Sequence, residues 1–269
     1  MNIKTPIVSV NWLKENLQDP ELIILDAVLD TPPHDQQIIG ARTFDIKNKF
    51  SDTSNSLPNT LPKPEAFATE ARKLGINKNS KIVVYDTKGI YSSPRAWYLF
   101  KSMGHDNVWV LDGGLPVWIE EKLPTEKVTE NSYSEGNFEA HFKPEMFKNK
   151  EQILENISSK KAVVVDARSS DRFNAETEEP REGLRSGHIP GAVNLPFSKV
   201  LKDGKYASKE ELEKILPNTN EPLYFSCGSG ITACIDLIAY ELIGSDAPKA
   251  VYDGSWTEWG QDHDLPIEK

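Results

Sequence analysis

An internal repeat constrains the fold of this chain more than any other feature of its sequence. Asp26-Ala27 recurs as Asp166-Ala167, and Gly40-Ala41 recurs as Gly191-Ala192. Three further matches share one spacing, 141 residues: Gly89-Ile90 with Gly230-Ile231, Asp112-Gly113 with Asp253-Gly254, and Trp118 with Trp259. Their common order predicts two homologous halves of ordinary domain size. We expect an N-terminal domain over residues 1–125, a linker over 126–147 and a C-terminal domain over 148–269.

Each half alternates short apolar runs with helical segments, which predicts an α/β fold. Strands are expected at 22–28, 41–46, 81–86 and 108–111, and again at 162–166, 192–195, 223–226 and 250–252. Helices are expected at 64–74, 92–103 and 208–216, the last opened by the capping box of Ser208 and Glu211. Two tandem domains follow, each a mainly parallel sheet covered by helices on both faces. The loop 51–64 is expected to be a surface excursion of the first half.

Composition excludes several classes of protein. The formal net charge of −10 argues against a nucleic-acid-binding surface. No apolar run approaches the roughly 20 residues of a membrane span, and the N-terminus lacks the apolar core of a secretory signal, so we expect a cytoplasmic protein. Cys227 and Cys234 are the only cysteines. Their spacing disfavours a disulfide and a zinc site, and Cys234 is expected to pack as a small buried side chain.

Cys227 stands at the most reactive position that the pattern predicts. An apolar run ends at Ser226, a loop of small residues runs to Ala233, and a second apolar stretch reaches Ile243. A thiol between a buried strand and a helix N-terminus meets converging N–H groups that favour the thiolate. Gly228 and Gly230 permit the backbone turns of such a loop. The alternatives are an inert buried cysteine, or a phosphate-binding loop, which needs an arginine where Ala233 stands.

Two longer segments carry a family resemblance. Residues 187–196, Gly-His-Ile-Pro-Gly-Ala-Val-Asn-Leu-Pro, and residues 250–259, Ala-Val-Tyr-Asp-Gly-Ser-Trp-Thr-Glu-Trp, flank the cysteine loop in sequence. With that loop they resemble the tandem-domain rhodanese-like sulfurtransferases over nearly the whole chain. The resemblance implies a catalytic second domain and a degenerate first domain. It also implies that Cys227 carries sulfur as a persulfide, without a metal or an organic cofactor. Asp86 stands at the repeat position of Cys227 and cannot carry sulfur, so the first domain is expected to be a structural partner.

The residues around Cys227 bear on the sulfur donor. Gly228 and Ser229 are neutral, whereas thiosulfate-preferring members of the family carry basic side chains there. The loop Cys-Gly-Ser-Gly-Ile-Thr resembles that of 3-mercaptopyruvate sulfurtransferases, with Ile231 in place of the commoner Val. We expect Gly228, Gly230, Ile231 and Thr232 to line the substrate, with a hydroxyl donor at Thr232. A thiosulfate sulfurtransferase and a sulfur-relay or binding module with little turnover are the alternatives.

Arginines are expected to hold the donor's carboxylate, because guanidinium pairs bidentately with carboxylate. Arg172 and Arg181 fall on the family's two substrate-contacting arginines. For Arg168 and Arg185 we expect solvated salt bridges, with a structural ion pair as the other possibility for Arg168. The acceptor is expected to be a thiol, such as thioredoxin or a small molecule, or cyanide. No nucleic acid or membrane is expected as a partner.

Proton handling is the least constrained feature. Ser229 is expected to donate a hydrogen bond towards the leaving enolate or to relay a proton. In related enzymes this serine belongs to a Ser/His/Asp relay, but here Gln37 stands at the expected histidine position. His34 is a weaker substitute, so solvent or the substrate itself is expected to move the proton. His188 is expected to tie its loop to the backbone rather than act as a base.

Overall fold

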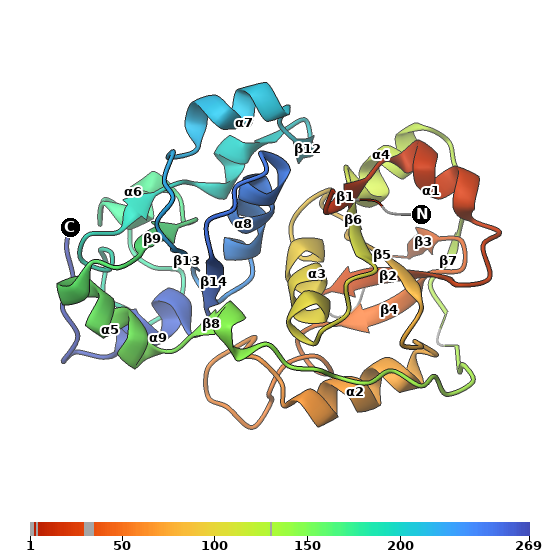
Figure 1. Ribbon diagram of the computed structural model, residues 1–269, viewed down its shortest axis with the longest axis horizontal. Helices are drawn as coiled ribbons and strands as arrows, with labels where there is room; N and C mark the ends of the chain where they lie inside the picture. Colours follow the sequence, from red (N-terminus) through yellow and green to blue (C-terminus); the bar gives the residue numbers. More distant parts are fainter. Residues whose placement is uncertain (1–2, 4, 30–34, 130) are drawn as a thin grey trace. The chain divides into compact units, whose positions relative to one another are not determined.

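The computed structural model describes residues 3, 5–29, 35–129 and 131–269. These residues form two compact units (Figure 1). Unit 1 contains residues 1–54, 61–143 and 203–206, and unit 2 contains residues 55–60, 144–202 and 207–269. No helix among the described residues is long and apolar enough to cross a membrane.

Unit 1 is built on a parallel five-stranded sheet in the order β1-β6-β5-β2-β4. Its strands are β1 (Ile7–Val8), β2 (Leu22–Val28), β4 (Arg42–Asp45), β5 (Lys81–Tyr85) and β6 (Val108–Leu111). Its helices are α1 (Val10–Asn16), α2 (Pro64–Lys73), α3 (Ser93–Ser102) and α4 (Gly114–Glu120). A separate antiparallel pair joins β3 (Gln36–Ile38) to β7 (Thr125–Lys127).

The sheet of unit 1 is covered on both faces. Leu13 of α1 and Trp118 of α4 pack with Val83 of β5 on one face. On the other face Phe67 of α2 and Phe100 of α3 pack around Phe44 of β4. Both layers exclude water from apolar side chains, which is the main stabilising contribution in a sheet of this kind.

Unit 2 repeats this plan with the order β10-β9-β13-β14-β8, again parallel throughout. Its strands are β8 (Phe147–Lys148), β9 (Val163–Asp166), β10 (Val193–Asn194), β13 (Leu223–Ser226) and β14 (Lys249–Tyr252). Its helices are α5 (Lys150–Ser159), α6 (Ser170–Phe173), α7 (Lys209–Ile215), α8 (Ala233–Leu242) and α9 (Ser255–Gln261). The short elements η1 (Pro144–Met146), η2 (Phe197–Val200), β11 (Leu201–Lys202) and β12 (Lys205–Tyr206) complete the chain.

Two layers of helices also cover the sheet of unit 2. Ile153 of α5 and Trp256 of α9 pack against Val164 of β9 on one face. On the other face Tyr240 of α8 meets Phe225 of β13 edge to face, with 5.6 Å between ring centroids. The predicted capping box at Ser208 is present, since Ser208 accepts from the Glu211 N–H and the Glu211 side chain accepts from the Ser208 N–H.

The predicted fold class is confirmed, and the predicted strands agree with the observed ones to within one residue at each end. One local prediction is wrong, because residues 55–60 of the loop 51–64 belong to unit 2 rather than to unit 1. The segment predicted as a linker docks along unit 1, where Phe138 N–H donates to the Ile76 carbonyl and His141 N–H donates to the Met103 carbonyl. The boundaries at residues 125 and 147 stay a prediction.

Candidate active site

Cys227 follows β13, the central strand of unit 2, and is 1% exposed. The next five residues, 228–232, form the loop that leads into α8 (Ala233–Leu242). The N–H groups of Cys227 and Gly230 donate to the Ser255 hydroxyl over 3.2 and 3.1 Å. That hydroxyl donates in turn to the Tyr252 carbonyl, 2.9 Å away. Ser255 therefore fixes both ends of the first turn of the loop.

Backbone conformation confines the loop further. Gly230 has a φ of +77°, in the left-handed region that glycine adopts without cost. Ser255 has a φ of +49°, which is unusual for a residue with a side chain. Sequence patterns give no sign of this strained serine, although it lies in the segment 250–259 that carries the family resemblance.

The predicted arginines lie beside the loop. A methyl group added to Gly228 would come 3.4 Å from Nη2 of Arg172 and 3.8 Å from Nη1 of Arg181. Arg172 belongs to the short helix α6 (Ser170–Phe173), and its side chain is 25% exposed. Arg181 lies on the exposed loop that follows. The structure thus brings together the sulfur-bearing loop and both guanidinium groups.

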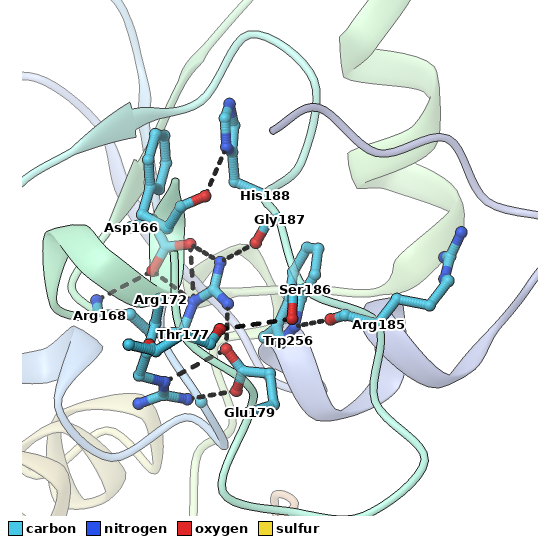
Figure 2. A network of polar contacts seen from close by, with 12 residues as sticks. Asp166, Arg168, Arg172, Thr177, Glu179, Arg185, Ser186, Gly187, His188 and Trp256 are labelled. Atoms are coloured by element: carbon cyan, nitrogen blue, oxygen red, sulfur yellow. Dashed lines mark hydrogen bonds and ion pairs between the residues drawn. The ribbon is translucent and has the colours of Figure 1, made fainter. Parts of the chain in front are cut away.

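Glu179 holds Arg172 in place, as Figure 2 shows. Its Oε2 accepts from Nη2 of Arg172 over 2.5 Å, and its Oε1 accepts from Nη1 of Arg168 over 2.7 Å. The Glu179 side chain is only 1% exposed, so this shared carboxylate is almost fully withdrawn from water. Glu179 compensates two cations at once, and its Oε1 also accepts from Nε of Arg172 over 3.2 Å.

Arg168 and Arg185 correct the expectation of solvated salt bridges. Arg168 is 1% exposed as a side chain and pairs with Asp166 over 2.7 Å as well as with Glu179. Burial alone would lower the pKa of Arg168, but the charges of Asp166 and Glu179 raise it, and the Trp256 ring lies 4.2 Å beneath the guanidinium. Arg185 instead donates to backbone carbonyls, including that of Gly260 at 3.1 Å. Both arginines are structural, and for Arg168 the ion-pair alternative is the one found.

Ser229 is 9% exposed, and its hydroxyl oxygen accepts two hydrogen bonds. Nδ2 of Asn59 donates over 3.1 Å and Nη2 of Arg181 over 3.4 Å. Thr257 is a further neighbour, whose hydroxyl donates to the Gly228 carbonyl over 2.6 Å and accepts from Nη1 of Arg181. Sequence reasoning missed Asn59 and Thr257. No motif marks Asn59, which lies 170 residues from its partner.

The remaining predicted residues lie as follows. Ile231 is 5% exposed, and Thr232 is the N-cap residue of α8 without a capping bond from its side chain. Cys234 is fully buried, and neither cysteine forms a disulfide. Its sulfur lies 3.7 Å from the Gly230 carbonyl, so the prediction of a small buried side chain is confirmed.

His188 and Gln37 each make their hydrogen bonds within their own unit. His188 bonds through Nδ1 to the Phe173 carbonyl at 2.9 Å and stacks on the Phe173 ring, so it ties its loop to the backbone as predicted. Gln37 is 1% exposed and donates to the Ala41 carbonyl and to Glu126 within unit 1. His34 lies outside the described residues.

This arrangement places one nucleophilic sulfur at the end of a central strand, beside two guanidinium groups and a hydroxyl. Such a site can bind a small carboxylate and accept an atom onto sulfur. An α/β protein with two copies of one parallel unit, only one of which carries the cysteine, is the class that the fold and site define.

Comparison with known proteins agrees with this class. The Rhodanese-like domain family matches residues 9–121 and 149–262. The chain is 38% identical to 3-mercaptopyruvate sulfurtransferase of Escherichia coli strain K12, over 98% of both chains. It is 36% identical to thiosulfate sulfurtransferase of Gallus gallus, over 94% of this chain and 92% of that one. The crystal structure of SseA from Escherichia coli superposes with a TM-score of 0.83 at 36% identity, covering 94% of this chain and 99% of SseA.

The chain therefore belongs to the rhodanese-like sulfurtransferases, with two domains in tandem. The family predicted from the cysteine loop and the two flanking segments is confirmed.

Proposed function

We propose that this chain takes sulfur from 3-mercaptopyruvate onto Cys227 and passes it to a thiol or to cyanide. The observation that carries the proposal is the placement of Arg172 and Arg181 against Gly228, the neutral residue next to the nucleophile. A carboxylate bound there by two guanidinium groups puts the donor's sulfur towards Cys227. The Escherichia coli relative with this substrate in its name supports the same donor.

The first half-reaction balances without an oxidant or reductant. The Cys227 thiolate attacks the donor's sulfur, an S–S bond forms and the donor's C–S bond breaks. The electron pair of the C–S bond remains on the leaving enolate. The proton that began on the donor's thiol converts this enolate to pyruvate. An acceptor thiol then attacks the outer sulfur of the persulfide and releases Cys227 for the next cycle.

Ser229 assists as a hydrogen-bond donor. A hydroxyl has one proton to donate and two lone pairs that accept. Asn59 and Arg181 supply donors to those lone pairs, and neither group is a base at neutral pH. The Ser229 proton is therefore available to the oxygen of the developing enolate, where charge appears in the transition state. Solvent or the substrate itself moves the remaining proton.

Residues 148–269 are the proposed catalytic domain, and residues 1–125 a domain without sulfur-transfer activity of its own. Cys227 and Ser229 act in catalysis, while Arg172, Arg181, Gly228, Gly230, Ile231 and Thr232 hold the donor. We further propose thioredoxin or a small thiol as the acceptor and the cytoplasm as the compartment. Two cysteines that do not form a disulfide fit a reducing compartment.

A paired assay tests the proposal. Turnover is measured with 3-mercaptopyruvate and with thiosulfate, each with cyanide as the acceptor, and intact mass is recorded after donor alone. We expect faster turnover with 3-mercaptopyruvate and a mass gain of one sulfur on the peptide that contains Cys227. A clear preference for thiosulfate, the donor named for the Gallus gallus relative, would overturn the donor. A mass gain on another residue would overturn the mechanism.

A further inference from the structure

Asp236 is a buried acid that the proposed reaction does not use. It is the fourth residue of α8 (Ala233–Leu242), the helix that begins where the Cys227 loop ends. The residue is 0% exposed, and neither carboxylate oxygen has a hydrogen-bond partner among the residues that the structure describes. A carboxylate without water or a donor is strongly disfavoured in a protein interior, so burial of this kind favours the neutral acid.

Asp236 faces the sheet of its own unit. Tyr240 lies one turn further along α8 and meets Phe225 of β13, and residues four apart share one face of a helix. Burial, first, and then the charges of Cys227 and Asp166 raise the pKa of Asp236 well above its ordinary value. In turn, burial and the charge of Asp236 raise the pKa of Tyr240.

The other titratable groups on the elements packed against α8 do not compensate an ionised Asp236. On β9, Asp166 is itself paired with Arg168. On β13 and β14, Tyr224 and Tyr252 pack in the apolar cluster with α5 and α9, and Lys249 pairs with Glu241. Lys199 of η2 is exposed to solvent. A negative charge on Asp236 would therefore meet two like charges and no cation from these elements.

Unit 1 has the opposite charge at the same place in the repeat. Arg95 of α3 precedes Asp236 by the common spacing of 141 residues and is also 0% exposed. The loop before α3 begins with Asp86, whose carboxylate accepts from the Ser92 N–H over 3.0 Å. Unit 1 thus has a cation at this helix position and a carboxyl group in the loop, whereas unit 2 has an acid at this helix position and a sulfur in the loop.

We propose that Asp236 remains a protonated carboxylic acid and thereby reserves the single negative charge of this region for the Cys227 sulfur. The sulfur begins a loop of N–H groups at a helix N-terminus, whereas Asp236 has no donor in the described residues. A helix N-terminus favours an anion, so negative charge is better accommodated at Cys227 than at Asp236. Asp236 does not contact the substrate in this proposal. It is a positioning residue that acts through Cys227, because its neutral form leaves the negative charge to the sulfur. The proposal rests on the proposed function only in requiring an anionic sulfur at Cys227.

Coupling of this kind is reciprocal. Removing the negative charge from the sulfur must make Asp236 easier to ionise, and the pH at which Asp236 loses its proton reports the state of Cys227. Alkylation of Cys227 with iodoacetamide replaces the thiolate by a neutral thioether, and so provides that change without a sulfur donor.

Infrared spectroscopy tests the proposal on the intact protein. At neutral pH the wild type is expected to show the carbonyl band of a protonated carboxylic acid, lost in Asp236→Asn and retained in Asp246→Asn, an exposed acid after the same helix. After alkylation the band is expected to disappear with a midpoint lower by about one pH unit or more, a tenfold change in acid dissociation. Absence of the band, or the same midpoint in both forms, would overturn the proposal.

Stability provides a second readout that needs no spectral assignment. Because folding raises the pKa of Asp236, the folded protein retains a proton that the unfolded chain releases above about pH 4. Wild type therefore loses stability as pH rises towards that raised pKa, and Asp236→Asn does not. Urea unfolding is expected to show the variant gaining on wild type between pH 5 and pH 8. A difference that is constant with pH would also overturn the proposal. Neither experiment requires turnover of a sulfur donor. Both therefore test the proposal for Asp236 even if the paired assay shows that 3-mercaptopyruvate is not the donor.

Discussion

The loops that follow the central strands of the two units share a backbone framework but begin with different side chains. After β5 of unit 1, Oδ2 of Asp86 accepts from the N–H groups of Tyr91, Ser92 and Ser93 over 2.8 to 3.0 Å. Its Oδ1 accepts from the Lys88 N–H, and the Ser93 hydroxyl adds a fifth donor at 2.6 Å. This loop is an anion-binding nest closed by its own carboxylate.

The loop after β13 has the same framework. The Leu115 N–H donates to the Asp86 carbonyl over 3.0 Å, and the Trp256 N–H donates to the Cys227 carbonyl over 2.9 Å, at the same repeat positions. Gly89 and Gly230 both have positive φ. The framework that surrounds the Asp86 carboxylate in one unit therefore recurs around Cys227 in the other. The comparison teaches that one loop framework can hold a carboxylate in unit 1 or a cysteine in unit 2, and that the first side chain distinguishes the two loops.

Substitution of the sulfur is expected to have the largest effect on transfer. Cys227→Ser removes the atom that carries the persulfide, so turnover falls by about three orders of magnitude or more. The serine occupies nearly the same volume, and the free energy of unfolding changes by about 1 kcal/mol or less. Steady-state assays and urea unfolding measure both quantities, with Cys234→Ala as the control that keeps turnover. Residual turnover within tenfold of wild type would refute the role of Cys227.

Substitution of Asp86 is expected to have the opposite effect, a large loss of stability with little loss of persulfide formation. Asp86→Ala leaves several buried N–H groups without an acceptor, and unfolding becomes easier by about 3 to 5 kcal/mol. At a temperature where the variant is folded, persulfide formation on Cys227 stays within a few-fold of wild type. Urea unfolding and intact-mass analysis provide the two readouts, and exposed Asp246→Asn is the matched control. If Asp86→Ala abolished the persulfide in a folded protein, the first loop would not be merely structural.

Much of this contrast could be predicted from the sequence. The strand-loop-helix pattern placed Cys227, and the repeat placed Asp86 opposite it, because apolar strands and glycine turns are local signals. Arg172 and Arg181 were found through a motif. Asn59 was not, because a contact between residues far apart in the chain leaves no local pattern. Asp236 left a signal that sequence reasoning did not use, a single acid within an apolar helix.

Substitution of a substrate-binding arginine is expected to have an intermediate effect on turnover, specific to the loop that carries Cys227. Arg172→Lys keeps the charge but loses the planar fork that pairs with a carboxylate and with Glu179. We expect kcat/KM for 3-mercaptopyruvate to fall about 10- to 100-fold. The control is Lys161→Gln, which removes a largely exposed cation. Alkylation of Cys227 by iodoacetamide, a neutral reagent, should change little, and equal losses in both reactions would point to a displaced loop instead.

Substitution of Ser255 is expected to have the smallest and most local effect among these predictions. At the corresponding repeat position unit 1 has Gly114, with a φ of +52° close to the +49° of Ser255. Both Ser255→Ala and Ser255→Gly remove the hydroxyl that accepts from Cys227 and Gly230, at a cost of about 1 to 3 kcal/mol. Only alanine retains the strained backbone, so the glycine variant should be more stable than the alanine variant by about 1 kcal/mol.

The reverse substitution in unit 1 completes the test of Ser255. Gly114→Ala would place a methyl group 2.5 Å from the Asp86 carbonyl oxygen and should therefore destabilise the protein through steric overlap as well as backbone strain. Urea unfolding of the three variants measures the order. An alanine variant of Ser255 as stable as the glycine variant would show that the backbone there is unstrained. The hydroxyl alone would then distinguish Ser255 of the reactive unit from its glycine counterpart.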